Sequence, residues 1–186
     1  MEYDYFKYDL KGQSGGVLIT DIIDDEQFVI LGKSNIPKRA DCFEGFGGKV
    51  EKCDVSSLHT ALRELIEEFF NLKIPLENIN EIANIIRKNK MIDRQYNFFG
   101  MSYVINFKTL NYIFLYLCEI ENSLQVYNID NIFDMQSYIG NRIINDKADG
   151  GLNEIQSLHL FKLSDIKEKK IKLRWFTDKI INKLFR

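Results

Sequence analysis

A helix with two unlike faces is the sequence feature that most constrains this chain. Residues 57–69 repeat apolar side chains at helical spacing. The members of this stripe are Leu58, Ala61, Leu62, Leu65, Ile66 and Phe69. Glu64, Glu67 and Glu68 are close enough in sequence to share another face of the same helix. We therefore predict a helix that packs its stripe on a core and presents its carboxylates to a cleft.

The three glutamates indicate chemistry, because like charges on one helical turn repel one another. A divalent cation offsets such repulsion, and Mg²⁺ binds through a few carboxylates together with substrate phosphates. Gly47 and Gly48 precede the helix, and their lack of side chains would let a backbone carbonyl lie beside the ion. The alternative is a solvated helix on which Arg63 pairs with Glu67 four residues later. The glycine pair at this distance favours the metal site.

The segments around this helix are rich in predicted strands. They are strands over 15–23, 27–31, 98–107, 112–120 and 158–163, helices over 129–144 and 174–185, and loops over 24–26 and 146–151. Strands on both sides of a central helix, with another helix at the end, predict an α/β fold in which helices cover both faces of a mixed β-sheet. No repeat or linker divides the chain, so we predict one domain over residues 1–186.

The net charge is −2 and the pI is about 5.8, which excludes an overall positive surface charge that would attract nucleic acid. The stretch over 162–186 is locally basic, which indicates either a solvated surface or a face for phosphates or RNA. Three cysteines without a C-x-x-C pair favour reduced thiols. The polar N-terminal residues and the short apolar run over 112–118 predict a soluble, cytoplasmic protein with no membrane partner.

The segment over 48–72 resembles the signature of the Nudix hydrolases, G-x5-E-x7-R-E-U-x-E-E-x-G-U, in which U is bulky and apolar. The matching residues are Gly48, Arg63, Glu64, Leu65, Glu67 and Glu68. The letters GFGGKV over 45–50 are also similar to the approach to this signature in oxidised-nucleotide-triphosphate hydrolases. The resemblance implies an α/β/α sandwich that hydrolyses a phosphoanhydride bond in a nucleotide or nucleoside-diphosphate derivative, with Mg²⁺ or Mn²⁺ as cofactor.

Two positions depart from the signature. Asp54 stands where the first Glu belongs, and eight residues rather than seven separate it from Arg63. We expect this shorter acid still to hold Arg63. Phe70 replaces the closing Gly, so we predict that Asn71 takes the left-handed position after the helix and that Leu72 anchors the chain beyond it. Neither departure removes a metal ligand.

The resemblance also implies roles for individual residues. Glu64, Glu67, Glu68 and the Gly48 carbonyl would bind the metal. The catalytic set would comprise Glu67, Glu154, Arg63 and Asp54, with Arg63 oriented by Asp54. Glu154 precedes a predicted strand in a stretch similar to a late family segment, and it would act as a base or bind a second metal; a surface glutamate is the alternative.

Residues that could contact substrate lie close to the signature. Lys49 could lie near the phosphates or be a solvated loop lysine, and Arg39 could hold a phosphate although a solvated loop is favoured. Phe43 could stack on a base, whereas Phe46 and Trp175 are predicted to pack in the core.

Two other functions stay open. The Asp54 spacing resembles the nucleolar RNA-decapping and inosine-diphosphatase branch and some viral Nudix proteins. Together with the basic stretch it suggests an RNA 5′-cap hydrolase, for which capped RNA would be the partner. The second alternative is a catalytically silent module that binds a nucleotide, against which the complete set of glutamates argues. The sequence leaves the substrate and the oligomeric state open, a homodimer included.

Overall fold

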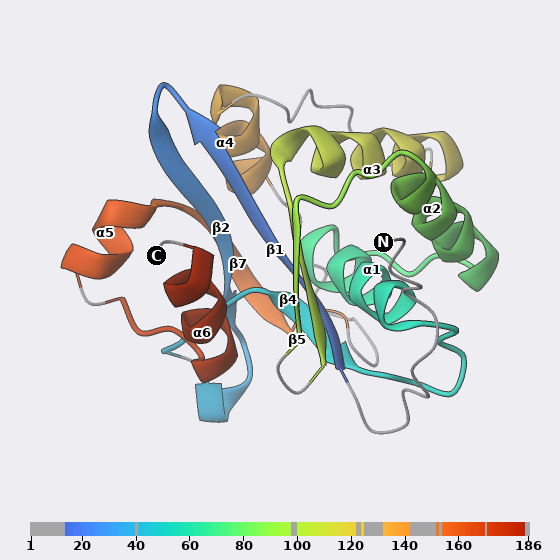
Figure 1. The fold of residues 1–186 in the computed structure, drawn as a ribbon, viewed down its shortest axis with the longest axis horizontal. Coiled ribbons are helices and arrows are strands. Elements are labelled where there is room, and N and C mark those ends of the chain that lie inside the picture. Colours follow the sequence, from blue (N-terminus) through green and yellow to red (C-terminus); the bar gives the residue numbers. More distant parts are fainter. Residues whose placement is uncertain are drawn as a thin grey trace, which may run out of the picture.

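The computed structural model describes residues 14–39, 41–97, 100–121, 124, 132–141, 152, 154–169 and 171–184. It shows a mixed seven-stranded β-sheet between two layers of helices (Figure 1). The predicted α/β fold with a mixed sheet is confirmed.

The centre of the sheet is a long antiparallel hairpin of β1 (Ser14–Ile23) and β2 (Glu26–Ser34). Its turn uses positive φ angles of 51° and 62° at Asp24 and Asp25, which suit a tight hairpin connection. β6 (Met101–Ile105) runs parallel to β1, and β5 (Arg94–Asn97) pairs antiparallel with β6 at the edge. The predicted hairpin is therefore present.

The other strands curve the sheet around the hairpin. β4 (Phe46–Lys49) pairs with β1 and β3 (Phe43–Glu44) pairs with β2, so the glycine-rich segment crosses from one strand to the other. β7 (Ile155–Lys162) pairs along most of β2 and confirms the strand predicted there. The 3₁₀-helix η1 (Pro37–Arg39) lies between β2 and β3.

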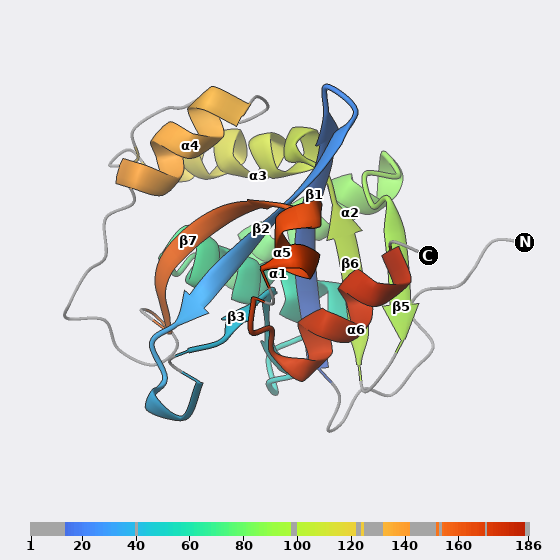
Figure 2. The same cartoon turned by 90° about the vertical axis from the view of Figure 1, so that its left-hand side faces the viewer.

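Helices cover the two faces of the sheet unequally (Figures 1 and 2). The first layer holds α1 (Ser57–Phe69), α2 (Leu76–Lys88), α3 (Phe107–Ile120) and α4 (Ile132–Asn141). The second layer holds α5 (Leu163–Glu168) and α6 (Trp175–Leu184), which lie in front of the sheet in Figure 2. Among the described residues, no helix has the length and apolarity to cross a membrane.

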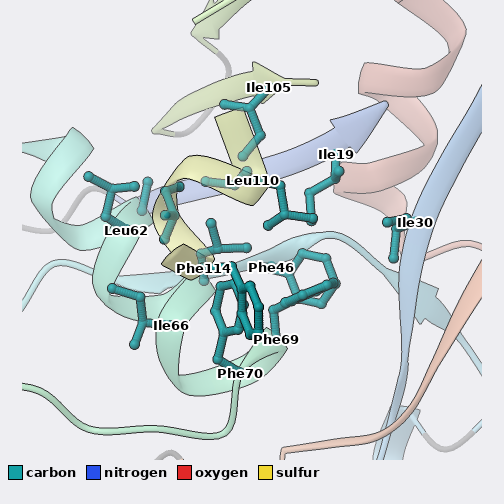
Figure 3. Close-up of a cluster of buried hydrophobic side chains, with 14 of the residues drawn as sticks. Ile19, Ile30, Phe46, Leu62, Ile66, Phe69, Phe70, Ile105, Leu110 and Phe114 are labelled. Carbon is teal, nitrogen blue, oxygen red and sulfur yellow. The ribbon is translucent and has the colours of Figure 1, made fainter. Parts of the chain in front are cut away.

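The larger core lies between the sheet and the first helical layer, and α1 supplies its centre (Figure 3). The Phe69 ring packs edge-on against Phe46, with ring centroids 5.4 Å apart, and Phe70 stacks on Phe114. Phe46 is 1% exposed, so its predicted core role is confirmed. Because the apolar stripe of α1 is fully packed here, the position of α1 against β1 and β4 is fixed.

Two expectations fail, and one helix was not predicted. Residues 112–120 belong to α3 and not to a strand, because Asn106 caps the helix by accepting the Thr109 N–H and because the buried residues recur at helical spacing. The helix α2 was not predicted from the sequence. Trp175 is 51% exposed on α6 and is not a core residue. The loop predicted over 146–151 lies outside the described residues.

Candidate active site

Close backbone approach positions the acidic helix against the glycine-rich strand. A Cβ at Gly15 of β1 would lie 2.3 Å from the Ser57 carbonyl oxygen of α1, so only glycine allows this contact. A Cβ at Gly48 of β4 would lie 2.2 Å from Oε1 of Glu64. The Glu64 carboxylate therefore lies directly against the Gly48 backbone, in agreement with the close approach expected from the sequence.

The three glutamates of α1 lie beside β4 and are buried to different degrees. Glu68 is 5% exposed, and its Oε2 accepts the Gly47 N–H at 2.7 Å. Glu64 and Glu67 are partly exposed. Glu154 is half-buried at the start of β7, and its carbonyl accepts the Asn35 N–H at 2.7 Å. Its charge acts on both Glu64 and Glu68, so the structure brings Glu154 near the acids of α1.

Burial makes the ionised form of these acids costly. It raises the pKa of Glu64 from 4.5 to about 7, against the opposing effect of Arg63 and with a further increase from Glu67. Burial, followed by the charge of Glu64, raises the pKa of Glu68 well above its ordinary range. Burial also raises the pKa of Glu67, and Arg63 and Lys73 oppose that shift. Such a cluster is a favourable place for a cation that binds carboxylates.

Arg63 links this cluster to the loop before α1. Its Nε and Nη2 donate to the two oxygens of Asp54, each at 3.1 Å, so the predicted pair is present as a bidentate clasp. The same guanidinium lies 2.9 Å from Glu64 Oε1 and 3.4 Å from Glu67 Oε2, and it also donates to the Lys49 carbonyl at 3.2 Å. Arg63 therefore couples the loop, β4 and two of the glutamates.

Asp54 is held by more donors than Arg63 alone. Its oxygens accept from the His59 ring Nδ1 at 2.9 Å, the Thr60 hydroxyl at 2.9 Å and the Glu51 N–H at 2.8 Å. Burial alone would raise the pKa of Asp54, but the hydrogen bonds from His59 and Arg63 outweigh it and hold that pKa well below its ordinary value. Asp54 is therefore a carboxylate at neutral pH.

The donor set suits a hard divalent cation, since it consists of carboxylate oxygens with an excess of negative charge. Within the described parts of the chain, no three acidic, imidazole or thiol groups stand in positions that would already enclose a metal ion. Glu64 is turned towards Arg63 instead. Binding a cation therefore requires a carboxylate to exchange a protein partner for the ion.

The predicted substrate residues are more widely spread. The Lys49 side chain is exposed on β4, and the Lys49 carbonyl accepts from Arg63. Arg39 is half-buried at the end of η1, where its backbone bonds to Ile36 and Cys42. The Phe43 ring packs edge-on against His159 and Phe161 within the apolar cluster on the α5 and α6 side of the sheet. The structure thus joins the Lys49 backbone to Arg63 and leaves Phe43 on the opposite face.

Residues 172–177, here called the clamp, hold the segment that leads into β4. The Lys172 carbonyl accepts the Phe43 N–H, and the Arg174 N–H donates to the Phe43 carbonyl, both at 2.9 Å. Thr177 Oγ1 accepts the Gly45 N–H at 2.9 Å. The Arg174 guanidinium pairs with buried Glu44, whose charge in turn acts on Glu68. Sequence reasoning missed Glu44 and Arg174, because no local pattern relates residues 130 positions apart. It also missed His59, although His59 is only five residues from Asp54.

The pH dependence of stability tests the electrostatics of this cluster. Below pH 4.5 Glu64 is protonated in both the folded and the unfolded chain, so the folded state has no disadvantage from its burial. Between 4.5 and about 7 the unfolded chain ionises first, which favours unfolding. Glu68 acts in the same direction. We expect denaturant unfolding in EDTA to show stability falling as the pH rises from 4.5 to about 7. A rise over this window would contradict the assignment.

No protein-family model and no curated protein sequence matches the chain. Solved structures do show similarity. A MutT/nudix family protein from Enterococcus faecalis is 13% identical with a TM-score of 0.39. The NUDIX domain of Shewanella oneidensis NrtR, complexed with ADP ribose, is 14% identical with a TM-score of 0.46. A C. elegans Ap4A hydrolase is 12% identical with a TM-score of 0.45.

Nudix proteins are among these structures. The matches cover 84%, 99% and 93% of this chain, in the order given above. The chain spans 45% of the Enterococcus protein, but 96% of the NrtR domain and 94% of the Ap4A hydrolase. At such low identity the likeness concerns the fold, so the activity of this chain is argued from its own residues.

Proposed function

We propose that this chain is a Nudix-type hydrolase that cleaves a phosphoanhydride bond in a nucleotide or nucleoside-diphosphate derivative, with Mg²⁺ or Mn²⁺ as its cofactor. One observation carries the proposal. Glu64, Glu67 and Glu68 lie together beside a glycine strand and are partly or fully desolvated, and Glu64 and Glu67 share one guanidinium, that of Arg63. A helix selected for stability alone gains nothing from buried carboxylates that repel one another.

The metal-binding residues in this proposal are Glu64, Glu67, Glu68 and the Gly48 carbonyl. The close approach of the Glu64 carboxylate to Gly48 supports a shared position for these donors. A bound divalent cation supplies an activated water and neutralises charge on a diphosphate. The raised pKa of Glu64 and of Glu68 is consistent with a cation taking the place of protons there.

The remaining residues orient the groups that react. Asp54 fixes the plane of the Arg63 guanidinium through two hydrogen bonds, and Arg63 in turn contacts both Glu64 and Glu67. Glu154, whose charge acts on Glu64, would accept a proton from water or bind a second cation. Lys49 is exposed on β4, where it would attract the phosphates of a substrate, and Arg39 would extend that basic rim.

A substrate panel with defined metal content tests this proposal. The panel contains nucleoside di- and triphosphates, ADP-ribose, Ap4A and capped RNA, each with Mg²⁺, with Mn²⁺ and with excess EDTA. We expect release of phosphate, pyrophosphate or a nucleoside monophosphate with either metal, complete loss in EDTA, and recovery when Mg²⁺ is restored. Turnover that persists in excess EDTA would overturn the metal-dependent mechanism.

The same panel separates the alternatives. Preference for capped RNA over free nucleotides would indicate the RNA 5′-cap hydrolase. Tight nucleotide binding by calorimetry, without turnover of any compound, would indicate the silent binding module. Chain residues outside the acid cluster determine which compound is preferred, so the panel also reports substrate class.

A further inference from the structure

His59 is a buried polar residue beside the clasp that the proposed mechanism does not use. It is 0% exposed in the first turns of α1. Its Nδ1 lies 2.9 Å from Asp54 Oδ1, and its buried Nε2 has no hydrogen-bond partner among the described residues. We propose that His59 is a positioning residue of the candidate active site, which acts through Asp54 on Arg63. This inference rests on the proposed function.

The direction of the His59 hydrogen bond follows from its partner. Asp54 as a carboxylate can only accept, so the ring must carry its proton on Nδ1. Nε2 is then a buried polar atom that no described residue satisfies, which is unfavourable. An apolar side chain of similar size would fill the same space without that loss. Packing therefore does not explain a histidine at this position, whereas the bond to Asp54 does.

The bond from His59 determines how Asp54 faces Arg63. Oδ1 of Asp54 accepts from His59 Nδ1 and from Arg63 Nε, while Oδ2 accepts from Arg63 Nη2, Thr60 Oγ1 and the Glu51 N–H. Among the described residues, His59 is the one donor besides Arg63 that holds Oδ1. Without it, the carboxylate can turn about its last bond towards the three donors on Oδ2, and the bidentate geometry is lost.

Loss of this geometry would affect the glutamates through Arg63, which contacts both sides. The guanidinium contacts Asp54 on one side and Glu64 and Glu67 on the other. When Asp54 holds it less well, Arg63 moves towards the other carboxylates and competes with the cation for them. The expected effect is on turnover and on metal affinity, with little effect on the affinity for the rest of the substrate.

Two substitutions at His59 separate the hydrogen bond from the volume of the ring. His59→Phe fills the site without a donor, while His59→Asn places an amide N–H the same number of bonds from the backbone as Nδ1. We expect His59→Phe to lower kcat about tenfold and to weaken Mg²⁺ binding measured by calorimetry, as groups that orient metal ligands do. KM should stay within about twofold, and His59→Asn should recover most of the loss.

A second readout does not need activity. Unfolding of the metal-free protein in denaturant is compared for His59→Phe and His59→Asn, each with Asp54 intact and with Asp54→Ala. The difference in midpoint between the two His59 variants should change when Asp54 is absent, because only the Asn variant has a bond to that carboxylate to lose, while the effects of side-chain size and polarity remain in both backgrounds. Leu62→Ala is the control for core damage: it should lower the midpoint and leave kcat unchanged at temperatures where it is folded.

The outcomes separate this inference from the proposed function. An inactive wild-type protein across the substrate panel would overturn the function, and the denaturant comparison would still decide whether His59 acts through Asp54. An active wild-type protein with normal kcat in His59→Phe would overturn the positioning role. Equal losses of kcat in the Phe and Asn variants, or a midpoint difference between them that is the same with Asp54 and with Asp54→Ala, would overturn it as well.

Discussion

A Glu68→Gln variant should lose on the order of 10²–10³ in kcat and remain folded, because it removes the charge that stabilises the transition state through the cation. The structure explains why the fold survives. Glu68 is buried, and Gln keeps an oxygen that can accept the Gly47 N–H. The metal-free variant should melt at the same temperature as the wild-type protein or higher, since the repulsion with Glu64 is gone.

Melting curves with and without Mg²⁺ provide the matching measurement. Mg²⁺ should stabilise the wild-type protein and have a reduced effect on Glu68→Gln, because ligand stabilisation follows affinity for the folded state. Glu154→Gln should lower turnover less and keep most of the Mg²⁺ effect. Glu168→Gln, on the exposed end of α5, is the neutral control. Near-normal turnover in Glu68→Gln, or its unfolding, would show that these acids have a structural role.

Breaking the clasp should have the largest effect on stability. Arg63→Ala leaves Asp54, Glu64 and Glu67 without their shared guanidinium, and removing one partner of a buried pair typically costs about 3–5 kcal/mol. Asp54→Ala should cost less, because Arg63 keeps its contacts to the glutamates and to the Lys49 carbonyl. Activity should fall in both variants.

The double mutant decides whether the two residues act as a unit. We expect Asp54→Ala with Arg63→Ala to be little worse than Arg63→Ala alone, both in denaturant unfolding and in kcat/KM. The exposed pair of Lys169 and Asp165, with a nitrogen-to-oxygen distance of 3.1 Å, is the control. Its disruption by Asp165→Ala should change stability by about 1 kcal/mol or less. Fully additive losses at Asp54 and Arg63 would rule out the clasp.

The acidic helix could be predicted in detail because its pattern is local. The apolar stripe and the three glutamates recur within four turns, and α1 covers the predicted residues Ser57–Phe69. The end of the helix could also be predicted from the sequence. Asn71 has a φ of 56°, and the Leu72 N–H donates to the Ile66 carbonyl, as expected for a left-handed residue followed by an apolar anchor.

Other elements depended on information that a local pattern does not contain. The run over 112–120 is rich in aromatic and β-branched residues, which favour a strand, but burial against the first core selects a helix. The cap at Asn106 and the spacing of Phe107, Leu110 and Phe114 were the available signals. The effect of the Glu154 charge on the α1 acids and the contact of Arg174 with Glu44 arise from tertiary structure alone.

The clamp of residues 172–177 has a consequence for how the protein is made. Gly45 and Thr177 are 132 positions apart, and their hydrogen bond forms only after both have left the ribosome. At synthesis rates of about 5–20 residues per second, the glycine strand emerges roughly 7 to 26 seconds before its clamp. During that interval the edge of β3 lacks the backbone bonds to Lys172 and Arg174. A nascent chain therefore carries its acidic helix well before it carries a finished site.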